Sequence, residues 1–121
     1  MSKMKLWLDD ERDPMTYGEN FNVLDQATKI LLLYGRAGWT WVKTVEDAKK
    51  VIENGNVSVL SCDNDLGTKQ EGYQLLNWLE EKAATEPNFP IPEHIYVHSH
   101  NVDRVGPMQQ AINSIKRFRN K

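Results

Sequence analysis

The sequence has little cysteine, no long hydrophobic run and no large excess of charge of either sign. Its single cysteine, Cys62, can form no internal disulfide bond. The longest apolar run, residues 30–34, is far shorter than the roughly 20 residues that a helix needs to cross a bilayer. The residues after Met1 contain no apolar signal core. These absences exclude a disulfide-rich scaffold and a membrane-spanning helix, and they predict a cytoplasmic protein with no membrane partner.

Acidic and basic residues nearly balance. Fifteen Lys and Arg residues against seventeen Asp and Glu residues give a formal net charge of −2. Such a balance argues against broad electrostatic attraction to nucleic acid or to an anionic membrane, and it leaves a local basic patch open. The 121 residues fit one domain and are too few for two ordinary ones. We therefore treat residues 1–121 as a single domain.

Strand-like and helix-like segments alternate along the chain. Apolar runs and alternating patterns predict four strands, at residues 4–8, 39–43, 57–62 and 94–99. Apolar residues at helical spacing predict four helices, one ending near residue 35, one at 45–55 after a Thr44 cap, one around 75–83 and one starting near 105. Because parallel strands need crossover connections, this alternation predicts an α/β fold whose parallel sheet is covered on both faces.

Ionisable side chains stand where three of these strands end. They are Asp9 and Asp10, then Asp63 and Asp65, then His98 and His100. Ligands bind at the carboxyl ends of parallel strands, so we expect these groups to converge. Carboxylates that gather at one edge repel one another unless a cation, a proton or water relieves them. We expect Mg²⁺, with Mn²⁺ as an alternative, because Mg²⁺ is commonly held by one or two carboxylates, water and substrate phosphate. The plainer alternative is that these acidic loops are simply solvated.

Several of these residues have more than one chemical role open to them. Asp63 could attack phosphorus as a nucleophile or bind the metal. Asp65 could bind the metal or act as a general acid or base. His98 could contact phosphate or donate a proton, and its structural alternative is a hydrogen bond to the backbone. No third and fourth nitrogen or sulfur ligands accompany His98 and His100, which argues against structural zinc.

Flanking residues add candidates for ligand binding. Asn101 could cap the last helix or bind substrate. Arg12 and Arg104 could brace a carboxylate or grip a phosphate, and solvation at the surface explains them equally well. The four tryptophans favour core packing over base stacking. Cys62 is expected to be a small buried apolar residue.

Residues 6–12, 60–67, 72–73 and 97–101 together resemble the cyclic-phosphate-processing receiver domain family, and the resemblance covers most of the chain. That family is a compact relative of response-regulator receiver domains. The resemblance implies a receiver-like (flavodoxin-like) three-layer α/β/α domain with a mostly parallel four-stranded sheet that lacks the usual fifth strand. It also implies a helical insertion at about 15–37, which could be a lid, a partner surface or extra packing.

The resemblance assigns roles to individual residues. It implies that Asp9, Asp10 and Asp63 bind the metal, and that Asp63 corresponds to the residue that accepts a phosphoryl group in receivers. Asp65, His98, Ser99 and Asn101 match further motif positions of the family, and Gly106 matches its glycine before the final helix. We predict Asp63, Asp65 and His98 as catalytic residues. The predicted substrate-binding residues are Arg12, Ser99, Asn101 and Arg104.

Two functions follow from this resemblance. The first is a Mg²⁺-dependent hydrolase that acts on a cyclic phosphate or a nucleotide phosphoester, including a nucleic-acid terminus. The alternative is a non-catalytic module that binds metal and a phosphorylated ligand, or accepts phosphate on Asp63, to regulate a protein partner. Asp63 and Asp65 also resemble the aspartate pair of haloacid-dehalogenase-type phosphatases, although the downstream lysine and acidic motifs of that family are not evident.

Overall fold

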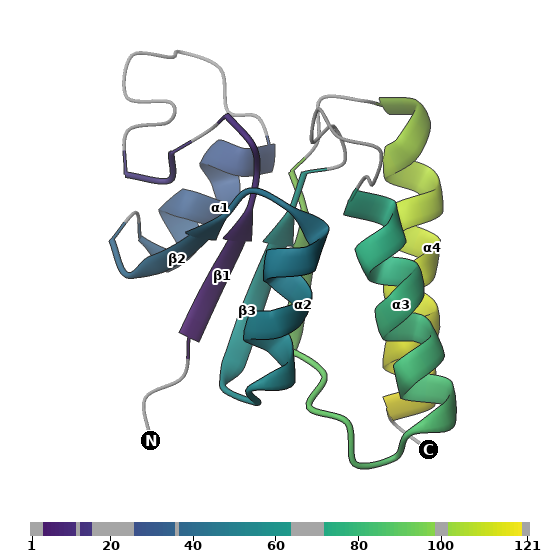
Figure 1. Ribbon diagram of the computed structural model, residues 1–121. Helices are drawn as coiled ribbons and strands as arrows, with labels where there is room; N and C mark the ends of the chain where they lie inside the picture. Colours follow the sequence, from purple (N-terminus) through teal and green to yellow (C-terminus); the bar gives the residue numbers. More distant parts are fainter. Residues whose placement is uncertain are drawn as a thin grey trace.

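The computed structural model describes residues 4–11, 13–15, 26–35, 37–63, 72–98 and 102–119. In chain order the elements are β1 (Met4–Leu8), α1 (Gln26–Tyr34), β2 (Trp39–Val42), α2 (Val45–Glu53), β3 (Val57–Cys62), α3 (Gly72–Thr85), β4 (His94–Val97) and α4 (Val102–Arg119) (Figure 1). The strands pair in parallel in the order β2-β1-β3-β4. This confirms a receiver-like α/β domain with a four-stranded sheet and no fifth strand within the described residues. No described helix is long and apolar enough to cross a membrane.

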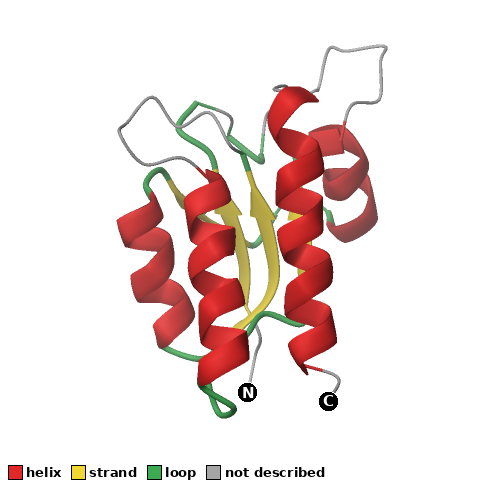
Figure 2. Cartoon of the chain, turned by 90° about the vertical axis from the view of Figure 1, so that its right-hand side faces the viewer, coloured by secondary structure: helices red, strands yellow, loops and turns green. Residues whose placement is uncertain are grey.

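The order of the strands creates a switch point in the middle of the sheet. The chain passes from β1 to β2 on one side, and then crosses back to β3 and β4 on the other side. Helix α1 lies on one face of the sheet, whereas α2, α3 and α4 lie on the other (Figure 2). In sheets wound in both directions, the crevice at such a reversal is where ligands bind. The relevant edge is therefore the carboxyl end of β1 and β3, at the top of Figure 1.

The main core lies between the sheet and the three helices α2, α3 and α4. Because side chains alternate along a strand, Leu6 and Leu8 of β1 and Leu60 and Cys62 of β3 point to this face, and all four are fully buried. Burial of a side chain such as leucine stabilises the fold by about 1.5–3 kcal/mol. Burial, with the neighbouring Asp63 carboxylate, also raises the pKa of the Cys62 thiol. Cys62 thus packs as a small apolar residue, as predicted.

Three of the four tryptophans pack on the face of the sheet that α1 covers. Trp7 is fully buried and packs against Ile30 and Leu31 of α1, with the half-buried Trp39 and Trp41 of β2 beside them. The fourth tryptophan, Trp78, packs on the other face against Phe89, with ring centroids 5.3 Å apart. The prediction that the tryptophans pack in the fold is therefore confirmed.

Local signals at the helix ends operate as the sequence predicts. The Thr44 hydroxyl accepts a hydrogen bond from the Asp47 amide at 3.1 Å, which caps α2. After α2, Gly55 adopts a φ of 89°, a left-handed conformation that glycine takes without strain. After α1, Gly35 does the same with a φ of 82°. Lys5 Nζ donates to the Tyr34 carbonyl at 2.9 Å and so ties the end of α1 to β1.

Two predicted boundaries differ from the structure. Helix α4 begins at Val102 rather than near 105, so Gly106 lies inside this helix and not before it. Pro107 removes one helical hydrogen bond without ending the helix. The buried side chains that follow it, Met108, Ile112 and Ile115, anchor α4 to the core. Strand β4 ends at Val97 rather than 99, although the His98 amide still donates to the Cys62 carbonyl at 2.9 Å.

Raising the pH from about 10 to about 12 is expected to destabilise the protein through Tyr34. Burial, together with a 2.6 Å hydrogen bond to the Tyr96 hydroxyl, raises the pKa of Tyr34 to about 12. A tyrosine in an unfolded chain has a pKa of about 10. Below that value the stabilisation is complete, and between the two values only the unfolded state loses its proton, so the free energy of unfolding falls.

Urea denaturation at a series of alkaline pH values measures this decline. Tyr34→Phe is the control, because it keeps the ring and removes the group that titrates. We expect a shallower decline in this variant than in the wild type. Equal declines in both proteins would contradict the assignment to Tyr34.

Candidate functional site

Three residues that directly follow strands lie side by side at the switch point. The Asp9 amide donates to the Val42 carbonyl, the Asp63 amide to the Leu8 carbonyl and the His98 amide to the Cys62 carbonyl, at 3.0, 2.8 and 2.9 Å. Each bond continues the parallel ladder one residue beyond a strand. Asp9, Asp63 and His98 therefore form a row across the ends of β1, β3 and β4, although they are far apart in the sequence.

Three carboxylates gather at this row. One carboxylate oxygen from each of Asp9, Asp10 and Asp63 lies within 4.8 Å of the others. Asp9 is fully buried, Asp63 is 4% exposed and Asp10 is half-buried. Like charges this close together in a low-dielectric setting repel strongly, and a divalent cation neutralises them. Oxygen atoms are also the ligands that Mg²⁺ and Mn²⁺ prefer, so the donors present fit such an ion.

His98 is held by side chains rather than by solvent. The imidazole is 1% exposed. Its Nε2 lies 3.0 Å from Asp9 Oδ2, and its Nδ1 lies 2.6 Å from Ser61 Oγ. The ring stacks on Trp7 with a centroid separation of 4.0 Å and an interplanar angle of 12°. These contacts are made with side chains, whereas the structural alternative left open by the sequence was a hydrogen bond to the backbone.

The path of the His98 side chain explains its contacts with Asp9, Ser61 and Trp7. His98 follows β4, whereas Asp9 and Trp7 belong to β1, and β3 lies between these two strands. Neighbouring strands are about 4.8 Å apart, so the side chain must cross one whole strand to reach β1. It crosses above Ser61, whose small side chain leaves room for the ring.

Asp9 is also fixed on its other sides. Its Oδ1 accepts a hydrogen bond from the Glu11 amide at 2.9 Å. Its backbone carbonyl accepts one from the Trp41 indole Nε1 at 2.7 Å. Together with the His98 contact, these bonds hold the orientation of a buried carboxylate, which would otherwise be costly to desolvate.

Several predicted site residues lie outside the described part of the chain. They are Arg12, Asp65, Ser99, His100 and Asn101. Arg104 belongs to α4, but its side chain is also outside the description. Their predicted roles stay predictions. The structure brings together Asp9, Asp10, Asp63 and His98.

The sequence interpretation missed Ser61 and the site role of Trp7. A weak signal was present, because Ser61 is one of two serines in a strand whose other residues are apolar. Alternation along the strand also places Ser61 on the face of the sheet opposite to Leu60. Trp7 pairs with Ser61 across β1 and β3, and Ser61 pairs with Tyr96 across β3 and β4. Only the order of the strands shows that Trp7 and Ser61 both contact the His98 ring.

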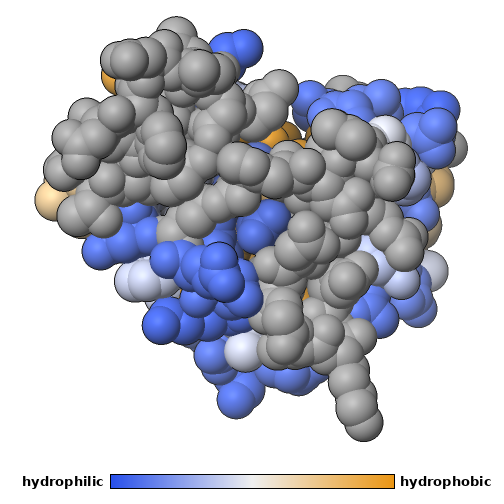
Figure 3. Space-filling model, turned by 90° about the horizontal axis from the view of Figure 1, so that it is seen from above, coloured by the Kyte–Doolittle hydropathy of each residue, from blue (hydrophilic) through white to orange (hydrophobic). Residues whose placement is uncertain are grey.

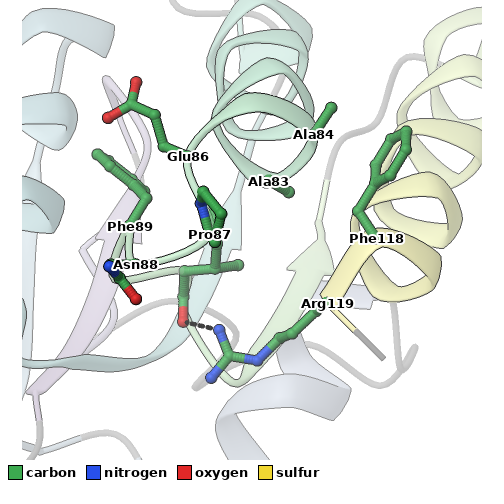
Figure 4. Close-up of a pocket in the computed structure, with 9 residues that line it drawn as sticks. Ala83, Ala84, Glu86, Pro87, Asn88, Phe89, Phe118 and Arg119 are labelled. Atoms are coloured by element: carbon green, nitrogen blue, oxygen red, sulfur yellow. Dashed lines mark hydrogen bonds between the residues drawn. The ribbon is translucent and has the colours of Figure 1, made fainter. Parts of the chain in front are cut away.

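The described surface at the acidic edge is hydrophilic, and a pocket lies at the far end of the molecule. Figure 3 looks down on the carboxyl ends of the strands, where the described surface is mostly hydrophilic. At the opposite end, a pocket of about 630 Å³ lies between the end of α3, the segment before β4 and the end of α4 (Figure 4). Arg119 in that pocket donates to the Ile91 carbonyl at 2.9 Å. This pocket shares no lining residue with the acidic cluster.

Comparison with known proteins identifies one family. The family model of the cyclic-phosphate processing receiver domain matches residues 4–114 of the 121. The match begins with β1 and extends into α4, so it includes the three clustered carboxylates and His98. No curated protein and no solved structure matches the chain.

Proposed function

Because the chain belongs to the cyclic-phosphate processing receiver domain family, we propose that its acidic edge hydrolyses a cyclic phosphate or a nucleotide phosphoester with the help of Mg²⁺. The observation that carries this proposal is the cluster of Asp9, Asp10 and Asp63 within 4.8 Å at the switch point of the sheet. The ligand is a small cyclic phosphate, a nucleotide or a nucleic-acid terminus.

The clustered carboxylates hold the metal and set the place of the reaction. Asp9, Asp10 and Asp63 supply oxygen ligands, and Mn²⁺ can replace Mg²⁺. When bound, the ion supplies Lewis-acid polarisation of a phosphoryl oxygen. Asp63 follows the inner strand β3, lies between Asp9 and His98 in the row, and contributes to catalysis as a ligand of the metal. The Asp9 carboxylate is held in place by His98 and by the Glu11 amide.

The reaction opens the phosphate ring. A bond forms between a water oxygen and phosphorus, one ring phosphorus–oxygen bond breaks, and the released oxygen takes up the proton that the water loses. We assign this proton transfer to Asp65, and His98 assists it through its contact with the Asp9 carboxylate. Ser99, Asn101, Arg12 and Arg104 are proposed to bind the phosphate and the organic part of the substrate.

Incubation of the purified protein with Mg²⁺ and a panel of cyclic phosphates tests the proposal. The panel contains cyclic mononucleotides and RNA that ends in a cyclic phosphate, and phosphorus NMR follows ring opening. We expect turnover of at least one substrate, and loss of this turnover on chelation of the metal or in Asp63→Asn. Asp47→Asn is the matched control, because Asp47 is an exposed aspartate of α2 outside the cluster. Absence of turnover across the panel would reject the hydrolase.

The same carboxylate cluster favours one other function, that of a receiver-like module. In that case Asp63 takes up a phosphoryl group and the phosphorylated domain regulates a protein partner. Treatment with a small phosphodonor followed by intact mass measurement would then show an acid-labile adduct in the wild type and none in Asp63→Asn. A wild type without an adduct would exclude this function.

A further inference from the structure

We propose that Ser61 is a positioning residue for the Asp9 carboxylate and acts through the imidazole of His98. The proposed reaction assigns no role to Ser61. The inference deepens the proposed function and rests on it in one respect, namely that Asp9 binds the metal. The contacts among Ser61, His98 and Asp9 are present in the protein without metal or substrate.

The geometry links three buried side chains in a line. Ser61 and Asp9 are fully buried and His98 is 1% exposed. Ser61 Oγ is 2.6 Å from Nδ1, and Asp9 Oδ2 is 3.0 Å from Nε2, so His98 bridges the other two residues through both of its ring nitrogens. Buried polar groups that are left unmatched are costly, which keeps such a bridge intact once it forms.

The chemistry of the partners gives the bridge a direction. When Asp9 is ionised it only accepts hydrogen bonds, and the 3.0 Å contact then has Nε2 donate its proton to Oδ2. A serine hydroxyl can turn to donate to the lone pair of Nδ1, and this bond favours the imidazole form whose proton is on Nε2. The Ser61 hydroxyl thus favours the tautomer of His98 that carries its proton on Nε2, the nitrogen that faces Asp9.

The size of Ser61 matters as much as its hydroxyl. The His98 ring crosses β3 above this residue and lies flat on Trp7, which is the neighbour of Ser61 in the β1 and β3 pairing. A larger side chain at position 61 would fill the space through which the ring passes. Trp7 fixes the plane of the ring, and Ser61 fixes its rotation within that plane.

These contacts orient the Asp9 carboxylate before any ligand binds. His98 holds Asp9 Oδ2, and the Glu11 amide holds Oδ1 at 2.9 Å. Hydrogen-bond partners of this kind, one step removed from a metal, change metal affinity by about 10–100-fold when they are mutated. Ser61 lies one step further away, because it acts through His98, so we expect Ser61→Ala to weaken Mg²⁺ binding by up to about 10-fold, the lower end of that range.

Nitrogen NMR of the histidine side chains in the metal-free wild type gives the first test. The protonated and the lone-pair nitrogens of an imidazole resonate far apart, and substitution of His94 and His100 in turn identifies the His98 signals. We expect a proton on Nε2 of His98. An Nε2 without a proton would overturn the proposal, whatever happens to any variant.

Ser61→Ala provides the second test. We expect this variant to shift the His98 nitrogen signals and the Glu11 amide signal, because that amide reports the position of Asp9. Ser58→Ala is the matched control on the same strand, since the Ser58 hydroxyl donates to the Met4 carbonyl, away from the site. Unchanged His98 and Glu11 signals in Ser61→Ala would overturn the role of Ser61.

The two readouts separate this inference from the proposed function. The NMR signals are recorded without metal and without substrate, so they test Ser61 even if the panel of cyclic phosphates gives no turnover. A Mg²⁺ titration then compares wild type, Ser61→Ala and Ser58→Ala. Equal affinities in the three proteins would overturn the link from Ser61 to the metal ligand Asp9.

Discussion

Replacing Asp9 by asparagine is expected to weaken Mg²⁺ binding by at least about 100-fold, the upper end of the range for groups one step removed from a metal. Asp9 is the fully buried member of the carboxylate cluster, and its orientation is fixed by His98 and the Glu11 amide. Asparagine keeps the shape of the side chain and an acceptor oxygen for His98, but it removes the negative charge. Isothermal titration with Mg²⁺, and with Mn²⁺ as the alternative ion, measures the change.

Asp47→Asn is the control for Asp9→Asn. Asp47→Asn removes one negative charge from the exposed first turn of α2 and should leave the affinity unchanged. Circular dichroism should show an intact fold in both variants, because neither substitution removes apolar burial. Wild-type affinity in Asp9→Asn would mean that the cluster is not a metal site.

Replacing Trp7 by alanine is expected to lower the free energy of unfolding by about 3–5 kcal/mol. Trp7 is fully buried, packs edge-to-face against Trp39 at 5.2 Å and stacks on His98 at 4.0 Å. Its removal leaves a cavity between the sheet and α1 and takes away the surface on which the His98 ring lies. Thermal unfolding should show a melting temperature lower by about 10 °C or more.

Two further variants separate packing from aromatic stacking at Trp7. Trp7→Phe keeps an aromatic ring in place, so it should be destabilised less than Trp7→Ala. Trp39→Ala removes a half-buried ring from the same cluster and should also cost less, because less apolar area is lost. A Trp7→Ala protein as stable as Trp39→Ala would contradict a central packing role for Trp7.

The sequence predicted the fold because the local patterns and the global arrangement agree. Apolar runs such as Met4–Leu8 and Val57–Cys62 form strands where their patterns predict them. The Thr44 cap and the glycines after α1 and α2 mark helix ends through backbone chemistry that acts over a few residues. The start of α4 was placed wrongly, because its first turns lack the apolar spacing on which the prediction depended, whereas Met108 and the buried row beyond it were predicted.

The acidic half of the candidate site was also accessible from sequence. Parallel strands end at a common edge, so Asp9 and Asp63 had to approach one another once both were placed directly after neighbouring strands. The partners of His98 were not accessible in this way. His98 is 37 positions from Ser61 and 89 from Asp9, and no local pattern connects them.

The sequence by itself therefore determined the alternation of strands and helices, the parallel sheet and the acid at its carboxyl edge. Each of these depends on hydrophobic period, on capping and on where charge follows a strand, which are properties of contiguous residues. Only the tertiary structure decided that His98 crosses β3 above Ser61, lies on Trp7 and holds Asp9. That arrangement depends on the order β1-β3-β4, which places side chains from three strands within hydrogen-bond reach of one another.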